Sequence, residues 1–187
     1  MIEVDIYLDI DGVIVPWFDP VEGIDVRASG FRDWRGQSLT HDRAEPVRGL
    51  RTYSPRMIRR IRAIGEMPHV RIHWCTTWRT GAHALAAAVG LPTDWPVLDE
   101  DMVHDRRETE ERTLRSWWKR DAVQEHHADG REGHAVVWID DDLAFDADAL
   151  DWMSTLGREG LAVHPRTVVG LPDLSLDVVE DFCLTRR

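Results

Sequence analysis

Apolar and polar side chains alternate at the start of the chain. Apolar residues occupy every second position from Ile2 to Leu8, which predicts a strand over residues 2–9 that ends before Gly12. Four later apolar runs predict further strands, over residues 70–75, 95–100, 134–140 and 161–165. Five short strands are therefore expected.

Apolar residues at helical spacing separate these strands. Ser54 followed by Pro55 is typical of a helix N-terminus, and the apolar stripe that follows predicts a helix over residues 55–65. The same reasoning predicts helices over 82–89, over about 108–127, from the cap Asp146 to Gly157, and over 176–184 after the cap Ser175. This alternation indicates a Rossmann-like, three-layer α/β/α fold with a central parallel sheet. Ligands of such folds bind at the carboxyl ends of the strands.

Residues 14–53 lack any sustained periodicity. They are rich in Gly, Pro, Asp and Arg, which is typical of an irregular or hairpin-bearing segment. The chain has no internal repeat, and its length fits one domain. We therefore expect a single domain over residues 1–187, in which 14–53 form a flap or mini-cap inserted after the first strand.

Composition restricts the class of protein. The 187 residues include 23 Lys and Arg against 34 Asp and Glu, a formal charge of −11, and only two cysteines, Cys75 and Cys183. No apolar run approaches the ~20 residues of a membrane helix, and the acidic N-terminus differs from a signal peptide. We expect a reduced, cytoplasmic protein that has no membrane partner, and nothing in the sequence indicates an obligate protein partner.

Basic residues are concentrated in one segment. Residues 27–62 contain ten arginines and three acidic residues, a local charge of +7 that leaves −18 for the rest of the chain. This segregation fits a surface that faces anions, and it fits a solvated arginine-rich helix face equally well. The insertion contains five aromatic residues, Trp17, Phe18, Phe31, Trp34 and Tyr53. They either stack on a base or form a small core within the insertion, and we favour the core.

Acidic residues and a hydroxyl follow three of the predicted strands. Asp9 and Asp11 are two residues apart at the end of an extended segment, so their side chains leave the same side of the strand. Thr76 follows a second strand, and the aspartates 140–142 follow a third. Each acidic motif alone fits a turn or a helix cap. Several like charges at one sheet edge need a compensating cation, and oxygen ligands favour Mg²⁺.

These motifs, in this order, resemble those of the haloacid dehalogenase (HAD) superfamily. "DIDGV" is similar to its motif I, Thr76 in "IHWCT" to motif II, Lys119 in "WWKRDAV" to motif III and "WIDDD" to motif IV. The resemblance runs from about residue 3 to residue 142. Lys119 is the only lysine beside 22 arginines, which favours a site that needs a compact point charge, although a surface lysine is the alternative.

The resemblance implies a small capless or mini-capped phosphatase that hydrolyses phosphate monoesters through an aspartyl-phosphate. Asp9 is then the nucleophile, and Asp11 is the general acid and base. Thr76 donates to a phosphoryl oxygen, and Lys119 balances negative charge. The implied cofactor is Mg²⁺, with Asp9, Asp11, Asp140 and Asp141 as the metal-site residues.

The sequence leaves the finer assignments open. It does not decide which of Asp140 and Asp141 ligates the metal directly, whether Asp142 joins them, or whether Thr77 shares the role of Thr76. Because only the insertion is available as a cap, we expect an open site that accepts phosphorylated small molecules, nucleotides or nucleic-acid ends. The alternatives are a non-catalytic binding or regulatory module of HAD fold and a nucleic-acid-processing accessory protein.

Overall fold

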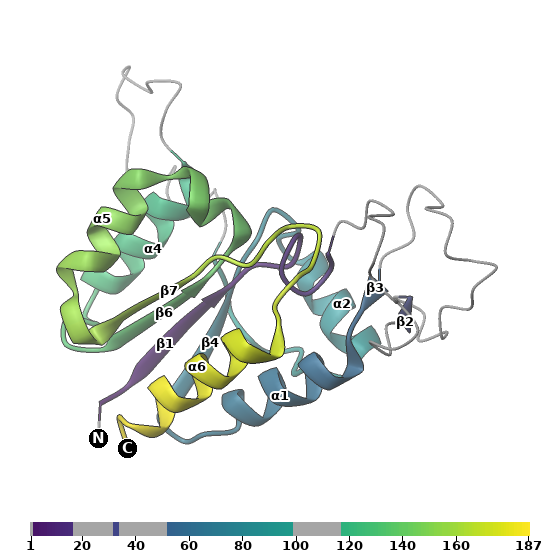
Figure 1. Ribbon diagram of the computed structural model, residues 1–187. Helices are drawn as coiled ribbons and strands as arrows, with labels where there is room; N and C mark the ends of the chain where they lie inside the picture. The colour runs from purple at the N-terminus through teal and green to yellow at the C-terminus, as the bar shows by residue number, and fades with distance from the viewer. Residues whose placement is uncertain (1, 17–31, 34–51, 99–116) are drawn as a thin grey trace.

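The computed structural model describes residues 2–16, 32–33, 52–98 and 117–187, which are built around one central sheet (Figure 1). Its five strands are all parallel, in the order β5-β4-β1-β6-β7. The strands are β1 (Val4–Leu8), β4 (Val70–Cys75), β5 (Val97–Leu98), β6 (Ala135–Ile139) and β7 (Gly160–Val163). The predicted Rossmann-like α/β fold is confirmed.

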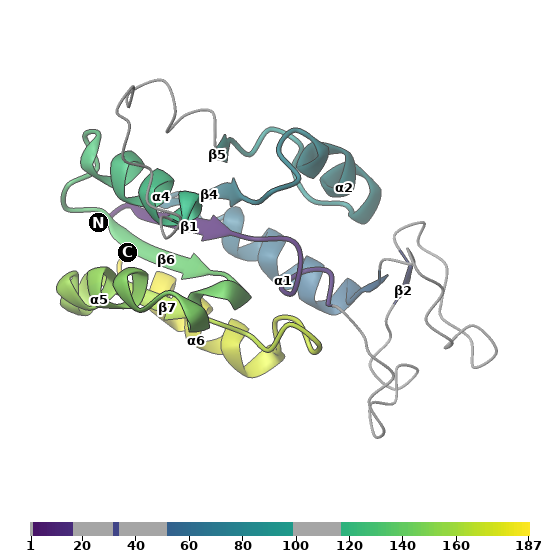
Figure 2. The same cartoon turned by 90° about the horizontal axis from the view of Figure 1, so that it is seen from above.

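Helices cover both faces of the sheet, with α1 and α6 on one face and α4 and α5 on the other (Figures 1 and 2). The helices are α1 (Pro55–Gly65), α2 (Gly81–Val89), α4 (Trp118–Ala128), α5 (Ala147–Thr155) and α6 (Asp173–Leu184), with 3-10 helices η2 (Asp141–Phe145) and η3 (Gly157–Glu159). Among the described residues, no helix has both the length and the apolar character needed to cross a membrane.

The central strand β1 is buried on both faces along its whole length. Val4, Ile6 and Leu8 pack into a core with α1 and α6, and Tyr7 packs into a second core with α4 and α5. Burial on both sides is typical of strands in parallel sheets that helices cover on each face.

The register of the sheet sets the level at which polar residues leave it. Leu8 pairs with Trp74 of β4 and with Ile139 of β6. Asp9 and Asp140 each come one residue later, so they leave neighbouring strands at the same level. Thr76 follows β4 directly, so all three lie at the carboxyl edge of the sheet.

Helix α1 has the bounds that the sequence predicts. The Ser54 hydroxyl accepts a hydrogen bond from the Met57 backbone N–H at 3.3 Å, which caps the first turn. The apolar stripe from Met57 to Ile64 is buried against the sheet. Local signals alone therefore define this helix.

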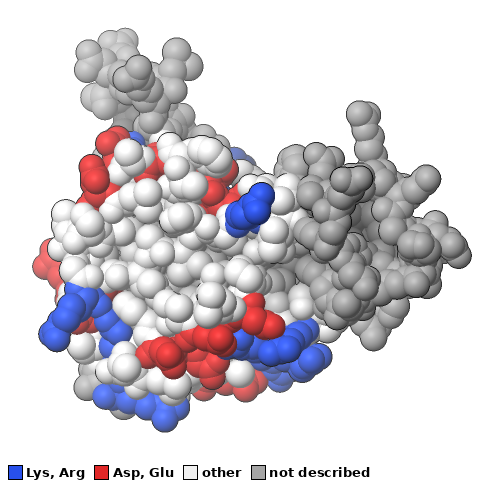
Figure 3. Space-filling model, viewed as in Figure 1, with Lys and Arg blue, Asp and Glu red and all other residues white. Residues whose placement is uncertain are grey.

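Ion pairs join the outer faces of α1 and α6. Arg60 binds Asp177 at 2.6 Å and Glu180 at 2.9 Å, and Arg56 pairs with Asp173 at 3.3 Å. Acidic and basic side chains lie next to one another on the lower part of the surface in Figure 3. For Arg56 and Arg60, the structure therefore favours an arginine-rich helix face over a surface that faces anions.

Two predicted helix bounds are wrong. The backbone of Trp117 is extended, so α4 begins after it, and no single helix runs over residues 108–127; residues 99–116 lie outside the described part of the chain. Helix α6 begins directly after Pro172, whose extended backbone forms the cap, and Ser175 lies inside the first turn.

Part of the insertion 14–53 is described. Its strands β2 (Arg32–Asp33) and β3 (Thr52–Tyr53) pair antiparallel, which agrees with a hairpin-bearing segment. Tyr53 is buried in the same core as α1 and therefore does not form an exposed stacking surface. The other four aromatic residues, Trp17, Phe18, Phe31 and Trp34, lie outside the described residues. The single-domain division and the flap stay predictions.

Candidate active site

Five polar side chains are buried together at the carboxyl edge of the sheet. They are Asp9, Thr76, Lys119, Asp140 and Asp141, and each exposes at most 6% of its surface. All five belong to the residues that sequence analysis selected. Ionisable groups are rarely buried to this extent unless they are paired or bind a metal.

Lys119 joins two of the carboxylates. It lies in the first turn of α4, and its Nζ is 2.9 Å from Asp9 Oδ2 and 2.8 Å from Asp140 Oδ2. Its side chain is 4% exposed, so the alternative of a surface lysine is wrong. The ammonium group bridges the ends of β1 and β6.

The two threonines after β4 are in different environments. Thr76 is buried, and its side chain hydrogen-bonds to Asp9. Thr77 is exposed. The buried site therefore includes Thr76 and excludes the Thr77 side chain.

The aspartates 140–142 also separate by position. Asp140 accepts a hydrogen bond from the Asp142 backbone N–H at 2.9 Å, which caps η2. The side chain of Asp141 is hydrogen-bonded to Thr167, whereas that of Asp142 is exposed. Asp140 and Asp141 thus enter the buried cluster, and the Asp142 carboxylate does not.

Gly12 gives Asp141 the space that it occupies. A Cβ atom at Gly12 would lie 2.2 Å from Asp141 Oδ2, and the backbone φ of 72° is one that side-chain-bearing residues rarely adopt. The sequence indicated only that Gly12 ends a strand. Its contact with a residue of another motif has no signal in a single sequence.

The charges of the site are unbalanced. Burial raises the pKa of Asp9, and burial together with the charge of Asp9 raises the pKa of Asp140. Burial by itself lowers the pKa of Lys119, but Asp9 and Asp140 outweigh this effect and raise it. Burial also raises the pKa of Asp141. One ammonium group cannot neutralise three carboxylates, so a bound cation would relieve their repulsion.

The donor set fits a hard divalent cation. One carboxylate oxygen each from Asp9, Asp140 and Asp141 lies within 4.8 Å of the other two. Oxygen ligands of this kind suit Mg²⁺. The carboxylate of Asp11 lies outside this group of three, so its place among the metal residues stays a prediction.

Asp11 is half-buried beside the cluster and contacts the turn after β4. The indole Nε1–H of Trp78 donates a hydrogen bond to Asp11 Oδ2 at 2.8 Å. Sequence analysis did not select Trp78. Its position two residues after Thr76 was the only available signal, and that signal does not reveal a partner on another loop.

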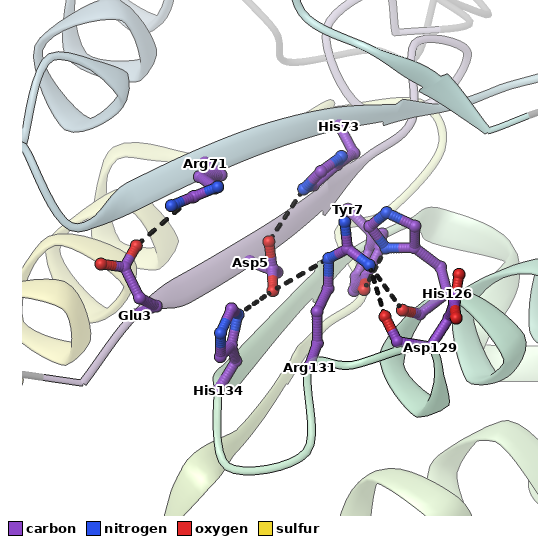
Figure 4. Close-up of polar contacts among 9 residues, drawn as sticks. All are labelled: Glu3, Asp5, Tyr7, Arg71, His73, His126, Asp129, Arg131 and His134. Atoms are coloured by element: carbon purple, nitrogen blue, oxygen red, sulfur yellow. Dashed lines mark hydrogen bonds and ion pairs between the residues drawn. The ribbon is translucent and has the colours of Figure 1, made fainter.

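A second polar cluster lies under α4, toward the opposite end of the strands (Figure 4). Asp5 binds His73 Nε2 at 2.9 Å and His134 Nδ1 at 2.7 Å, and the Tyr7 hydroxyl binds His126 Nδ1 at 2.9 Å. Burial alone raises the pKa of Asp5, but its histidine partners outweigh this effect and lower it. The three histidines tie α4 and its following turn to β1 and β4.

The chain matches the model of a known protein family. The model of the HAD domain in Swiss Army Knife RNA repair proteins matches residues 6–175, which include both carboxylates after β1, Thr76, Lys119 and the aspartates 140–142. Comparison with curated proteins and with solved structures gave no match.

Proposed function

The chain belongs to the family of HAD domains in Swiss Army Knife RNA repair proteins, and from this membership and the site geometry we propose that it is a Mg²⁺-dependent phosphatase with an aspartyl-phosphate intermediate. Domains of this family are generally hydrolases. The observation that carries the proposal is the buried bridge from Asp9 through Lys119 to Asp140. It keeps a carboxylate nucleophile beside a fixed positive charge.

Asp9 and Asp11 act together in the first half-reaction. A carboxylate oxygen of Asp9 bonds to phosphorus while the bond from phosphorus to the ester oxygen breaks. The electron pair of the broken bond stays on the leaving oxygen, and the carboxylic acid of Asp11 gives that oxygen its proton. An alcohol departs and leaves an aspartyl-phosphate at Asp9.

Water completes the reaction. Its oxygen bonds to phosphorus while Asp11, now a carboxylate, takes the proton that water loses. The bond between phosphorus and Asp9 breaks, and inorganic phosphate leaves. Both aspartates return to their starting protonation states.

The remaining residues orient the groups and balance their charge. The Thr76 hydroxyl, which bonds to Asp9 in the free site, turns its single O–H to a phosphoryl oxygen when substrate binds. Lys119 opposes the negative charge that gathers on the phosphoryl group and on Asp9. Asp9, Asp140 and Asp141 would hold Mg²⁺, which when bound stabilises negative charge on the phosphoryl oxygens.

We propose a phosphorylated nucleic-acid end as the substrate class. The description of the family names RNA repair, which supports this choice. Mononucleotides and small phosphate esters present the same phosphomonoester group and serve as comparison substrates. Their turnover relative to an oligonucleotide measures how much recognition extends beyond the phosphate.

The test is release of inorganic phosphate in Mg²⁺ and in EDTA. The substrates are RNA oligonucleotides with a 3′- or a 5′-phosphate, nucleoside monophosphates and p-nitrophenyl phosphate. The isosteric variant Asp9→Asn is the matched control, with its fold checked by circular dichroism. We expect Mg²⁺-dependent release from the wild type and none from the variant. Release that persists in EDTA, or in Asp9→Asn, would contradict the proposal.

A further inference from the structure

The segment after β4 supplies one hydrogen-bond donor to each aspartate that follows β1. The Thr76 side chain binds Asp9, and the Trp78 indole binds Asp11 Oδ2 at 2.8 Å. The Trp78 backbone N–H also points to the Thr76 hydroxyl, at 3.4 Å. Two loops that are 67 residues apart in sequence therefore meet through paired contacts.

The turn that carries Trp78 has a fixed shape. Arg79 adopts φ 51°, a left-handed conformation that residues other than glycine seldom adopt. Backbone hydrogen bonds close the turn, from Arg79 N to Thr76 O at 3.3 Å and from Gly81 N to Trp78 O at 2.9 Å. The half-buried Trp78 ring packs against the core that contains α1 and α2. The indole N–H is therefore held in one direction by backbone and packing.

The backbone around Asp11 is equally constrained. Gly12 N–H donates to Val15 O at 2.9 Å, and the backbone N–H groups of Ile14 and Val15 both reach Ile10 O at 2.9 Å. The Asp11 side chain is half-buried, and its carboxyl group reaches the turn after β4. The contact with Trp78 limits rotation of that group about its Cβ–Cγ bond.

We propose that Trp78 is a positioning residue, which orients the Asp11 carboxyl group for proton transfer to the leaving oxygen. This inference rests on the proposed phosphatase function. Proton transfer depends strongly on geometry, and loss of a well-placed acid costs roughly 10²- to 10⁴-fold in rate. Trp78 touches neither phosphorus nor the leaving group in this role.

The nature of the leaving group separates positioning from support of the fold. An alkoxide, as in a nucleotide, is a poor leaving group and needs the proton from Asp11. The p-nitrophenolate ion leaves without that proton. Trp78→Phe keeps an aromatic ring and removes the N–H, so it should slow hydrolysis of a nucleoside monophosphate by about tenfold or more and change that of p-nitrophenyl phosphate much less. A general loss of structure would slow both esters equally.

Two further variants sharpen the test. Trp152→Phe makes the same change at a half-buried tryptophan of α5, which stacks edge-on against His127 and Trp138, and we expect both esters to be unaffected. In an Asp11→Asn background, Trp78→Phe should have no further effect on the nucleoside monophosphate, because Trp78 acts through Asp11.

The experiment measures kcat/KM for both esters in the four variants and the wild type. If the wild type releases phosphate in Mg²⁺ neither from these two esters nor from a phosphorylated RNA oligonucleotide, the proposed function fails, and the inference fails with it. If the wild type is active but Trp78→Phe slows both esters equally, the inference is overturned and the function stands. The inference is also overturned, and the function stands, if Trp78→Phe lowers kcat/KM for the nucleoside monophosphate by the same factor with Asn at position 11 as with Asp.

Discussion

Lys119 shows how one side chain can be singled out by sequence and then explained by structure. It is the only lysine among 23 basic residues, and its ammonium group lies within 2.9 Å of both Asp9 and Asp140. A buried pocket between two carboxylates accepts a compact charge. The planar, longer guanidinium group of arginine needs more room and a forked partner.

We predict that Lys119→Arg lowers kcat by at least about 100-fold. Arginine keeps the positive charge, so a lower kcat would show that the pocket requires the compact shape of the lysine ammonium group. The control is Arg120→Lys at the next position, where Arg120 pairs with Asp146 at 3.1 Å and with the exposed Asp148 at 2.9 Å. Near-wild-type turnover of Lys119→Arg would contradict the point-charge role.

We predict that Gly12→Ala weakens Mg²⁺ binding roughly 10- to 100-fold, because its Cβ would displace the Asp141 carboxylate. Gly130→Ala is the matched control: its φ of 75° carries the same strain, and nothing lies within 4 Å of the added atom. The left-handed backbone by itself should cost each variant about 1 kcal/mol of stability. Calorimetric titration with Mg²⁺ measures the difference, and equal affinities in the two variants would exclude this role for Gly12.

For single residues, the sequence predicts which side chains belong to the site better than it predicts what those side chains contact. The aspartates and Thr76 follow recognisable strand ends, which the parallel register brings together, and Lys119 stands out as the only lysine of the chain. Gly12 and Trp78 act through residues that lie far away along the chain. No local pattern encodes such a contact, because it depends on how two loops approach each other.

Among the elements, α4 connects the two polar clusters. Its first turn carries Lys119, and its last turn carries His126, whose ring contacts both Tyr7 and His73. Burial, followed by the charges of His73 and Arg131, lowers the pKa of His126 to about 4, against the weaker opposing effects of Asp5 and Asp129. The neutral imidazole is therefore the form that the folded protein prefers.

We predict that stability falls as the pH is lowered from about 6.5, the ordinary pKa of histidine, to about 4. In this range the unfolded chain binds a proton at His126 that the folded protein does not, so acid favours unfolding. His126→Gln removes this contribution and should flatten the dependence of the unfolding free energy on pH. Urea denaturation at several pH values measures it, with the exposed His164→Gln as control. An unchanged slope in His126→Gln would be incompatible with this account.

The elements also show where local signals are sufficient. Ser54, Pro55 and the apolar stripe define α1 because its cap and its buried face are both local. The starts of α4 and α6 were misplaced because tertiary contacts set them: Trp117 stacks on Trp138 of β6, and Leu171 N–H, just before α6, binds Val13 O at 3.0 Å.

For the whole molecule, charge is the feature that bears on substrate choice. The chain carries −11 in total, although residues 27–62 carry +7. Arg56 and Arg60 are paired with α6 and Arg62 with Glu66, which leaves Arg59 and the arginines of residues 27–51 as the candidates for contact with a long polyanion. Their positions lie largely outside the described residues, so this stays a prediction from the sequence.

We predict that kcat/KM falls more steeply with salt for a phosphorylated oligonucleotide than for a nucleoside monophosphate. Arginines that contact several phosphates release bound counterions, and salt opposes that release. Replacing Arg43, Arg48 and Arg51 with alanine should bring the two salt curves together. Curves that are parallel in the wild type would show that recognition does not extend beyond the terminal phosphate.

The central claim is that Asp9 becomes phosphorylated, and the most direct measurement is to trap that intermediate. Asp11→Asn should slow hydrolysis of the intermediate, whereas p-nitrophenyl phosphate can form it without a proton from residue 11. Mixing this variant with p-nitrophenyl phosphate and Mg²⁺ and quenching the mixture in acid should therefore trap a phosphoenzyme. Peptide mass spectrometry then locates the phosphoryl group. The account predicts it on Asp9, with none on the Asp9→Asn, Asp11→Asn double variant. A phosphoryl group located on another residue would contradict the account. So would a wild-type enzyme that turns over substrate without ever carrying a phosphoryl group.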